Sequence, residues 1–173
     1  MSEATTPKHG GIRLKTQVKM RMQGRAVSHS RTDVSVRDLR TVIDEPVERG
    51  GTNQGPSPTE TFVAALVGCT SVISHKIAHK NGIALHGMAI AVEAEFDRRG
   101  VTLAEDVAVP FPAMTLTIDV RSDASAGQIE QLQRELAMFC PIAKLIRASG
   151  TVLTEVWNVR PPTAADAEAG AGH

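Results

Sequence analysis

The two cysteines of the chain, Cys69 and Cys140, are the residues whose types are best suited to chemistry. A free cysteine is most often a small buried hydrophobic residue. Two cysteines can also form a redox pair, in which one thiolate attacks an oxidant and the second thiol closes a disulfide. The residue types alone leave both interpretations open.

Cys69 lies in the apolar run 62–73, inside the first predicted helix. Helical spacing places it on one stripe with Leu66 and Ile73, so a core position is the simplest interpretation of this residue. The run is apolar almost all round, which predicts that the helix is buried at the centre of the fold.

Cys140 has a different setting because Pro141 follows it. Proline removes an intrahelical hydrogen bond and disfavours helical geometry in the residue before it. We therefore expect the second helix to break here, with Cys140 at the N-terminus of a new helical segment. Unsatisfied N–H groups at that end, and nearby Lys144, would favour a thiolate.

Two further patterns resemble ligand sites but are better explained without a ligand. His75 and His79 have a metal-binding spacing on one helix face, but no acidic or cysteine ligand joins that face. We interpret them as solvated residues at a helix end. The glycine-rich loop 50–55 lacks the lysine and the preceding βαβ context of a phosphate-binding loop, so we interpret it as an ordinary loop.

Composition excludes several classes of protein. Apolar residues make up 42% of the 173 residues and charged residues 22%, as in a soluble globular protein. The 19 basic and 19 acidic side chains balance, so no net charge attracts nucleic acid or an anionic membrane surface. With 4 Phe, 1 Trp and no Tyr, the chain lacks stacking platforms for single-stranded nucleic acid.

We expect a single domain over 11–160, with disordered tails at 1–10 and 161–173. The first ten residues are polar, without the apolar segment of a secretory signal. No uninterrupted apolar run approaches the ~20 residues that span a bilayer. These features predict a cytoplasmic protein. Paired cysteines rarely form structural disulfides in that compartment.

Hydrophobic periodicity predicts an α+β fold, with antiparallel sheets packed around two helices. The first helix begins at a capping box, Ser57-Pro58-Thr59-Glu60, and stops at Asn81-Gly82. The second helix covers 126–149 and includes the break at Cys140. The predicted strands are 12–22, 26–30, 34–43, 88–96, 114–120 and 151–159, with a turn at 32–33 and a loop at 45–58.

Two linked motifs resemble the OsmC/Ohr family of thiol peroxidases. In the stretch 50–69, a glycine-rich loop, a Ser-Pro helix start and an Ala-Ala pair precede Cys69. The second motif is Cys140-Pro141-Ile142 followed by an aliphatic stretch. The resemblance covers nearly the whole domain. It implies an OsmC-like fold and an intertwined homodimer with active sites at the subunit boundary.

The resemblance also implies a reaction. Such proteins reduce organic hydroperoxides in oxidative-stress defence, without metal, haem or flavin. Carried over, Cys69 is the peroxidatic cysteine that becomes a sulfenic acid. Cys140 is then the resolving cysteine that closes a disulfide, which a dithiol such as a lipoyl group reopens. This chemistry is coherent, because a nearby thiol prevents over-oxidation.

The sequence departs from the family's efficient peroxidases at one position. They carry a glutamate directly after the signature proline, where it holds an arginine against the thiolate. Here that position is Thr59, and Glu60 comes one residue later, on the face of the helix opposite Cys69. Candidates for the arginine are Arg25, Arg40 and Arg49. The alternative function is an OsmC-like protein that binds a small apolar ligand or senses oxidants.

Two expectations can be checked by structure or by assembly. Cys69 and Cys140 should approach within disulfide reach, with Cα atoms less than about 7 Å apart or separable by a small local shift. A helix that is apolar all round needs more cover than one small sheet offers, so we expect a homodimer that buries well over ~2,000 Å².

Overall fold

The computed structural model describes residues 16–163 and 166. The chain divides into two compact units, one up to Pro56 and one from Ser57 onwards. A single domain over 11–160 therefore stays a prediction. The predicted tail 1–10 lies outside the described residues, as does 161–173 apart from 161–163 and 166.

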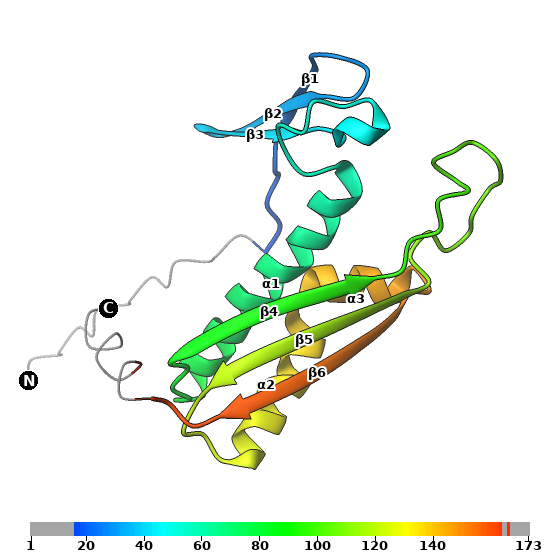
Figure 1. Ribbon diagram of the computed structural model, residues 1–173. Coiled ribbons are helices and arrows are strands. Elements are labelled where there is room, and N and C mark those ends of the chain that lie inside the picture. The colour runs from blue at the N-terminus through cyan, green and yellow to red at the C-terminus, as the bar shows by residue number, and fades with distance from the viewer. Residues whose placement is uncertain (1–15, 164–165, 167–173) are drawn as a thin grey trace, which may run out of the picture. The chain divides into compact units, whose positions relative to one another are not determined.

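The first unit is a three-stranded antiparallel meander in the order β1-β2-β3 (Figure 1). Its strands are Gln23–Ala26, Thr32–Val36 and Leu39–Ile43, and a short 3-10 helix, η1, follows at Val47–Arg49. The meander was predicted, but its strand boundaries were wrong. No strand lies within 16–22, and residues 12–15 of that predicted strand lie outside the described residues.

The predicted turn at 32–33 lies within β2, and the chain turns on either side of that strand, at 27–31 and at Arg37 and Asp38. Arg37 has a φ of +55°, the left-handed conformation that a two-residue hairpin loop requires. Glycine or asparagine usually marks such a position. Because arginine stands there, the sequence carried no signal for the turn.

Asp44 fixes the loop that follows β3. Its buried carboxylate accepts hydrogen bonds from the Thr52 hydroxyl (2.5 Å) and from the N–H groups of Thr52 and Gln54 (both 3.1 Å). Gly51 is required in this loop, because a Cβ there would overlap the carbonyl oxygen of Glu45. The glycine-rich stretch is thus a loop closed on a carboxylate.

Replacing Asp44 with asparagine should loosen this loop at neutral pH. The Thr52 hydroxyl, with the N–H groups of Gln54, Thr52 and Glu45, holds the pKa of Asp44 below its ordinary value, although burial raises it. Because its pKa is lowered in the fold, the Asp44 carboxylate stabilises the folded protein at pH values above its unfolded pKa of about 3.9. This stabilisation is lost as pH falls through the folded pKa.

Hydrogen exchange of the Thr52 and Gln54 amides tests this expectation. At pH 6 these amides should exchange faster in Asp44→Asn than in the wild type, and the difference should vanish in acid. Asp38→Asn, in the exposed turn, is the control and should match the wild type. Equal protection in all three proteins at pH 6 would contradict the assigned role of Asp44.

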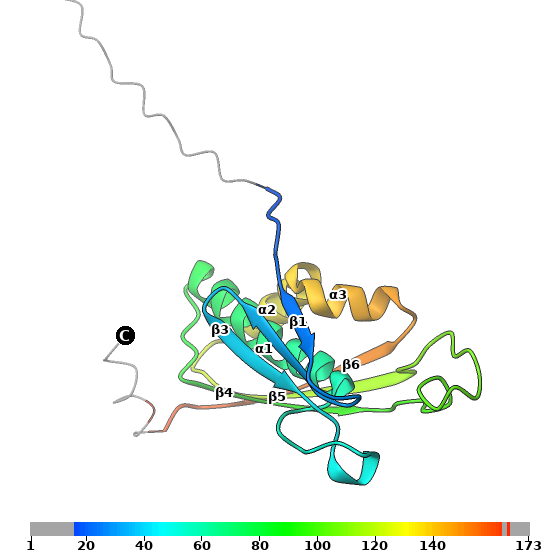
Figure 2. The same cartoon turned by 90° about the horizontal axis from the view of Figure 1, so that it is seen from above.

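The second unit contains a three-stranded sheet, ordered β4-β5-β6, with three helices on one of its faces (Figure 2). In chain order its elements are α1 (Pro58–Lys80), β4 (Gly87–Ala94), β5 (Ala113–Arg121), α2 (Ala126–Phe139), α3 (Pro141–Ala148) and β6 (Val152–Arg160). The inward face of β5 forms the centre of the core, with Met114, Leu116, Ile118 and Val120 almost fully buried. The α+β class predicted from periodicity is confirmed.

The expectation of antiparallel sheets was wrong for one strand pair. β4 and β5 are antiparallel, but β5 and β6 are parallel, and their arrows point the same way in Figure 1. The physical reason is the connection between them, which runs through α2 and α3. A crossover of this length carries the chain back to the end of the sheet where β5 begins, so β6 runs in the same direction as β5.

α1 begins and ends where its capping box and its Asn81-Gly82 stop signal predict. The Ser57 hydroxyl accepts a hydrogen bond from the Glu60 N–H, and the Ser57 N–H donates to the Glu60 carboxylate at 2.7 Å, so the capping box is confirmed. The helix ends at Lys80, before Gly82 with a φ of +65°. A capping box at Ser125 and Gln128 likewise starts α2.

α1 is less buried within the single chain than its composition predicts. Leu66, Thr70, Ser74, Ile77 and Ala78 are its buried residues. In contrast, the side chains of Phe62 and Val72 are 40% and 54% exposed. The sheet and the other helices of the single chain cover only one side of α1, so its burial on every side, expected from a homodimer, stays a prediction.

Among the described residues, α1 is also the one helix whose length and composition would let it cross a membrane. Core helices of globular proteins pass the same test. α1 packs against α2, α3 and β4, so we interpret it as a core helix.

Candidate active site

The structure brings the two cysteines together. The thiol of Cys140 donates a hydrogen bond to the sulfur of Cys69 across 3.2 Å, and both cysteines are free. A disulfide requires a sulfur separation of about 2.05 Å, so a small local shift would join them. The expectation that Cys69 and Cys140 approach within disulfide reach is confirmed.

Each cysteine owes its position to a different local feature. Cys69 lies in the middle of α1, packed against the core, one turn after the buried Leu66. Cys140 lies at the predicted break, where its φ of −71° and ψ of 107° end α2 and Pro141 starts α3. Its extended backbone turns the chain between the two helices, and its side chain is part of the core.

The two thiols differ in exposure. Cys69 is half-buried, whereas Cys140 is 0% exposed. Burial raises the pKa of the Cys140 thiol, and the N–H groups of Ala143 and Ile142 lower it by less, while Cys69 adds to the rise. The expectation that helix-end N–H groups make Cys140 a favoured thiolate was wrong, since the loss of hydration outweighs them.

The N-terminal turn of α1 carries Thr59 and Glu60. Thr59 contacts the Ser57 hydroxyl at 3.2 Å, and Glu60 caps the helix. Both line an apolar hollow of about 400 Å³ with Val63, Ala64, Val67, Val92, Ala94, Phe96 and Phe111. Neither cysteine belongs to its lining. At the position where the efficient peroxidases carry a glutamate, this chain has Thr59, whose hydroxyl lies beside that of Ser57.

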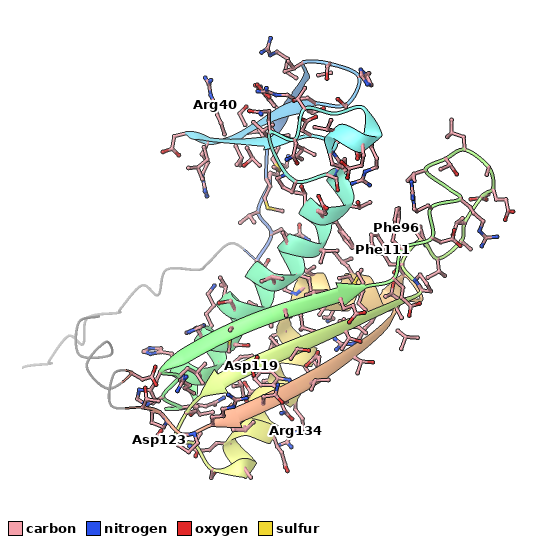
Figure 3. The ribbon with its side chains drawn as sticks, viewed as in Figure 1. Arg40, Phe96, Phe111, Asp119, Asp123 and Arg134 are labelled. Atoms are coloured by element: carbon pink, nitrogen blue, oxygen red, sulfur yellow. The ribbon has the colours of Figure 1, made fainter. Side chains whose placement is uncertain are left out.

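The three candidate arginines all belong to the first unit. Arg25 and Arg40 lie on the same face of its sheet and line a polar hollow of about 460 Å³, together with Asp33 and Ser35. Figure 3 labels Arg40 on this sheet. Arg49 forms an ion pair with Glu45 at 3.0 Å. The assignment of an arginine to the thiolate stays a prediction.

The sequence of the site can now be compared with known families. A family model described as OsmC-like protein matches residues 51–155, which include both cysteines. The chain belongs to the OsmC-like family. No curated protein sequence matches it significantly.

Solved structures show the OsmC-like fold in this chain. An OsmC-like protein from Mycoplasma pneumoniae has a TM-score of 0.66 at 13% identity, covering 84% of this chain and 99% of its own. An organic hydroperoxide resistance protein OsmC from Legionella pneumophila has a TM-score of 0.60 at 16% identity, covering 84% of this chain and 98% of its own. The organic hydroperoxide resistance protein OhrB of Bacillus subtilis has a TM-score of 0.53 at 17% identity, covering 83% of this chain and 98% of its own.

Two aromatic features of this OsmC-like chain were not predicted from its sequence. Phe96 lies 4.9 Å from Phe111, and Phe111 lies 5.5 Å from Phe62, between ring centroids, so three of the four phenylalanines gather at one end of the second unit (Figure 3). The fourth, Phe139, directly precedes Cys140 and contacts Lys80. With only four phenylalanines in the chain, their positions were the one sequence signal for the aromatic cluster and for the contact with Lys80.

The paired histidines lie in the last turns of α1. Both His75 and His79 are exposed, and His75 Nδ1 lies 2.8 Å from the carbonyl oxygen of Ser71. Within 16–163 and 166, no three His, Cys, Asp or Glu side chains are grouped to hold a metal ion.

Proposed function

We propose that this OsmC-like protein reduces organic hydroperoxides, with Cys69 as the attacking thiolate and Cys140 as the resolving thiol. The observation that supports this role is the 3.2 Å contact between a half-buried sulfur and a fully buried one. Cys69 is the more exposed of the two residues and so the one that a peroxide would meet, and the sulfur of Cys140 lies where it could trap the product. The hydroperoxide-resistance names of two structural relatives agree with this chemistry.

The proposed cycle balances with one external reductant. The Cys69 thiolate attacks the terminal oxygen of the hydroperoxide, the O–O bond breaks, and the products are a Cys69 sulfenic acid and an alkoxide. The alkoxide takes up a proton and leaves as the alcohol. The Cys140 thiol then displaces water from the sulfenic acid, forming the disulfide. A dithiol, such as a lipoyl-type group, gives two electrons and two protons and restores both thiols.

The working form in this proposal is a cytoplasmic homodimer. One stripe of α1 beside Cys69 is exposed and consists of small or apolar residues: Phe62, Ala65, Gly68 and Val72. A contiguous apolar surface of this kind is typical of an interface. A second copy of the chain on this stripe would place each active site at the subunit boundary.

A second candidate function is binding of a small apolar ligand without turnover. The apolar hollow beside Thr59 and Glu60 favours it, because its size of about 400 Å³ and its aromatic lining are typical of ligand sites. The threonine in place of a bracing acid points the same way. This function would leave the two thiols as oxidant sensors.

Stopped-flow oxidation separates the two candidates. The reduced protein is mixed with one equivalent of cumene hydroperoxide or of hydrogen peroxide, and the remaining thiols are counted over time. We expect loss of both thiols, faster with cumene hydroperoxide. Thiols that react with cumene hydroperoxide no faster than free cysteine would overturn the peroxidase proposal and favour the binding protein.

A further inference from the structure

A stripe of α1 leads from the thiols to two positive charges. Cys69, Ile73, Lys76 and Lys80 are spaced by four, three and four residues, so they share one face of the helix. Beside this stripe lies a trough of about 260 Å³, lined by Ile73, Lys76, Ile77, Lys80, Glu135 and Phe139. The trough lies between α1 and the last turns of α2, and Phe139 directly precedes Cys140.

One of the two lysines is already engaged. The Lys80 ammonium lies 3.3 Å from the Glu135 carboxylate and 5.9 Å from the centre of the Phe139 ring. Glu135 also accepts hydrogen bonds from Gln131 at 2.9 Å and Asn81 at 3.2 Å. This carboxylate is therefore occupied by partners of its own.

Lys76 has no such partner. Within the residues that the structure describes, no hydrogen bond or ion pair involves its ammonium, and the side chain is exposed. Its position seven residues after Cys69 places the two about 10 Å apart along the helix axis, since each residue rises 1.5 Å. The half-buried Ile73 lies between them and offers an apolar surface.

We propose that Lys76 is a specificity-determining residue that recognises an anionic group on the hydroperoxide. This inference rests on the proposed function. The favoured substrate carries a carboxylate about 10 Å from its peroxide, joined by an apolar chain. The chain lies along Ile73 and Phe139, the carboxylate meets the Lys76 ammonium, and the terminal peroxide oxygen reaches the Cys69 sulfur. Lys80 contributes less, because Glu135 already neutralises it.

A matched substrate pair tests the proposal. One substrate is a linear carboxylic acid with a hydroperoxide at the far end of its chain, and the other is its methyl ester. The wild type should reduce the acid with a kcat/KM about three- to fivefold above that of the ester, the size expected for one exposed ion pair. Lys76→Met should remove this preference through KM, with kcat unchanged. Lys76→Arg should retain it.

Cumene hydroperoxide, which has no carboxylate, is the control and should be reduced equally by all three proteins. Equal use of acid and ester by the wild type, or a preference that survives in Lys76→Met, would overturn the role of Lys76. Calorimetric binding of the corresponding hydroxy acid and its ester gives a readout without turnover. Lys76-dependent binding of the acid, with no reaction of any hydroperoxide, would support the anion site and overturn the proposed peroxidase.

Discussion

Replacing Cys69 with serine should abolish hydroperoxide turnover, lowering it roughly a thousandfold or more. The physical reason is acidity, because a serine hydroxyl does not present an anion to the peroxide near neutral pH. The wild type itself should turn over more slowly than the family's efficient members, since Thr59 stands where they carry the bracing acid. Consumption of cumene hydroperoxide with a dithiol reductant measures both rates.

Cys140→Ser is the matched variant, and its expected outcome is different. Cys69 should still react once, at a rate close to that of the wild type, and then remain as sulfenic or sulfinic acid because no thiol can displace water. Mass spectrometry after one equivalent of hydroperoxide shows the added oxygen. An unmodified Cys69 in this variant would show that Cys69 is not the peroxidatic cysteine and would favour the ligand-binding function.

The second large effect concerns assembly. Light scattering at micromolar concentration should give a mass twice the 18.4 kDa of one chain. Val72→Glu should shift the mass to that of a single chain, because the change would place a charge within the apolar α1 stripe beside Cys69. Val72 is 54% exposed in the single chain, so the substitution leaves the core of the monomer intact.

Val101→Glu is the control for this experiment. Val101 is 62% exposed and lies in the loop between β4 and β5, outside the α1 stripe. This variant should assemble as the wild type does. A wild type that is monomeric at micromolar concentration would count decisively against the homodimer, and a Val72→Glu protein that remains dimeric would place the interface elsewhere.

The second unit could be predicted from sequence where local chemistry decides the structure. The capping box of Ser57 and Glu60 and the break at Pro141 depend on residues within one helical turn, and both are present as predicted. The pairing of β6 with β5 depends instead on where two helices carry the chain. Strand alternation reports which residues face the core and carries no information on strand direction.

The candidate site was predictable for a different reason. Spacing alone does not place Cys69 beside Cys140, because their contact joins two helices far apart in the sequence. The pairing came from the resemblance of two motifs. The electrostatics could not be read the same way, since a helix N-terminus suggested an acidic Cys140 and complete burial made it a weaker acid.

The complete burial of Cys140 also decides which sulfur of the proposed disulfide an external reductant would attack. A reducing thiolate from outside has access to one sulfur only, that of Cys69, so the mixed disulfide between protein and reductant must form there. Cys140 is then the leaving group, and a thiol whose pKa is raised leaves slowly. The burial of Cys140 would therefore slow the reductive half of the cycle, in addition to any effect of Thr59 on the attack on peroxide. A dithiol would be favoured over a single thiol, because its second sulfur can release the mixed disulfide before Cys140 attacks it again.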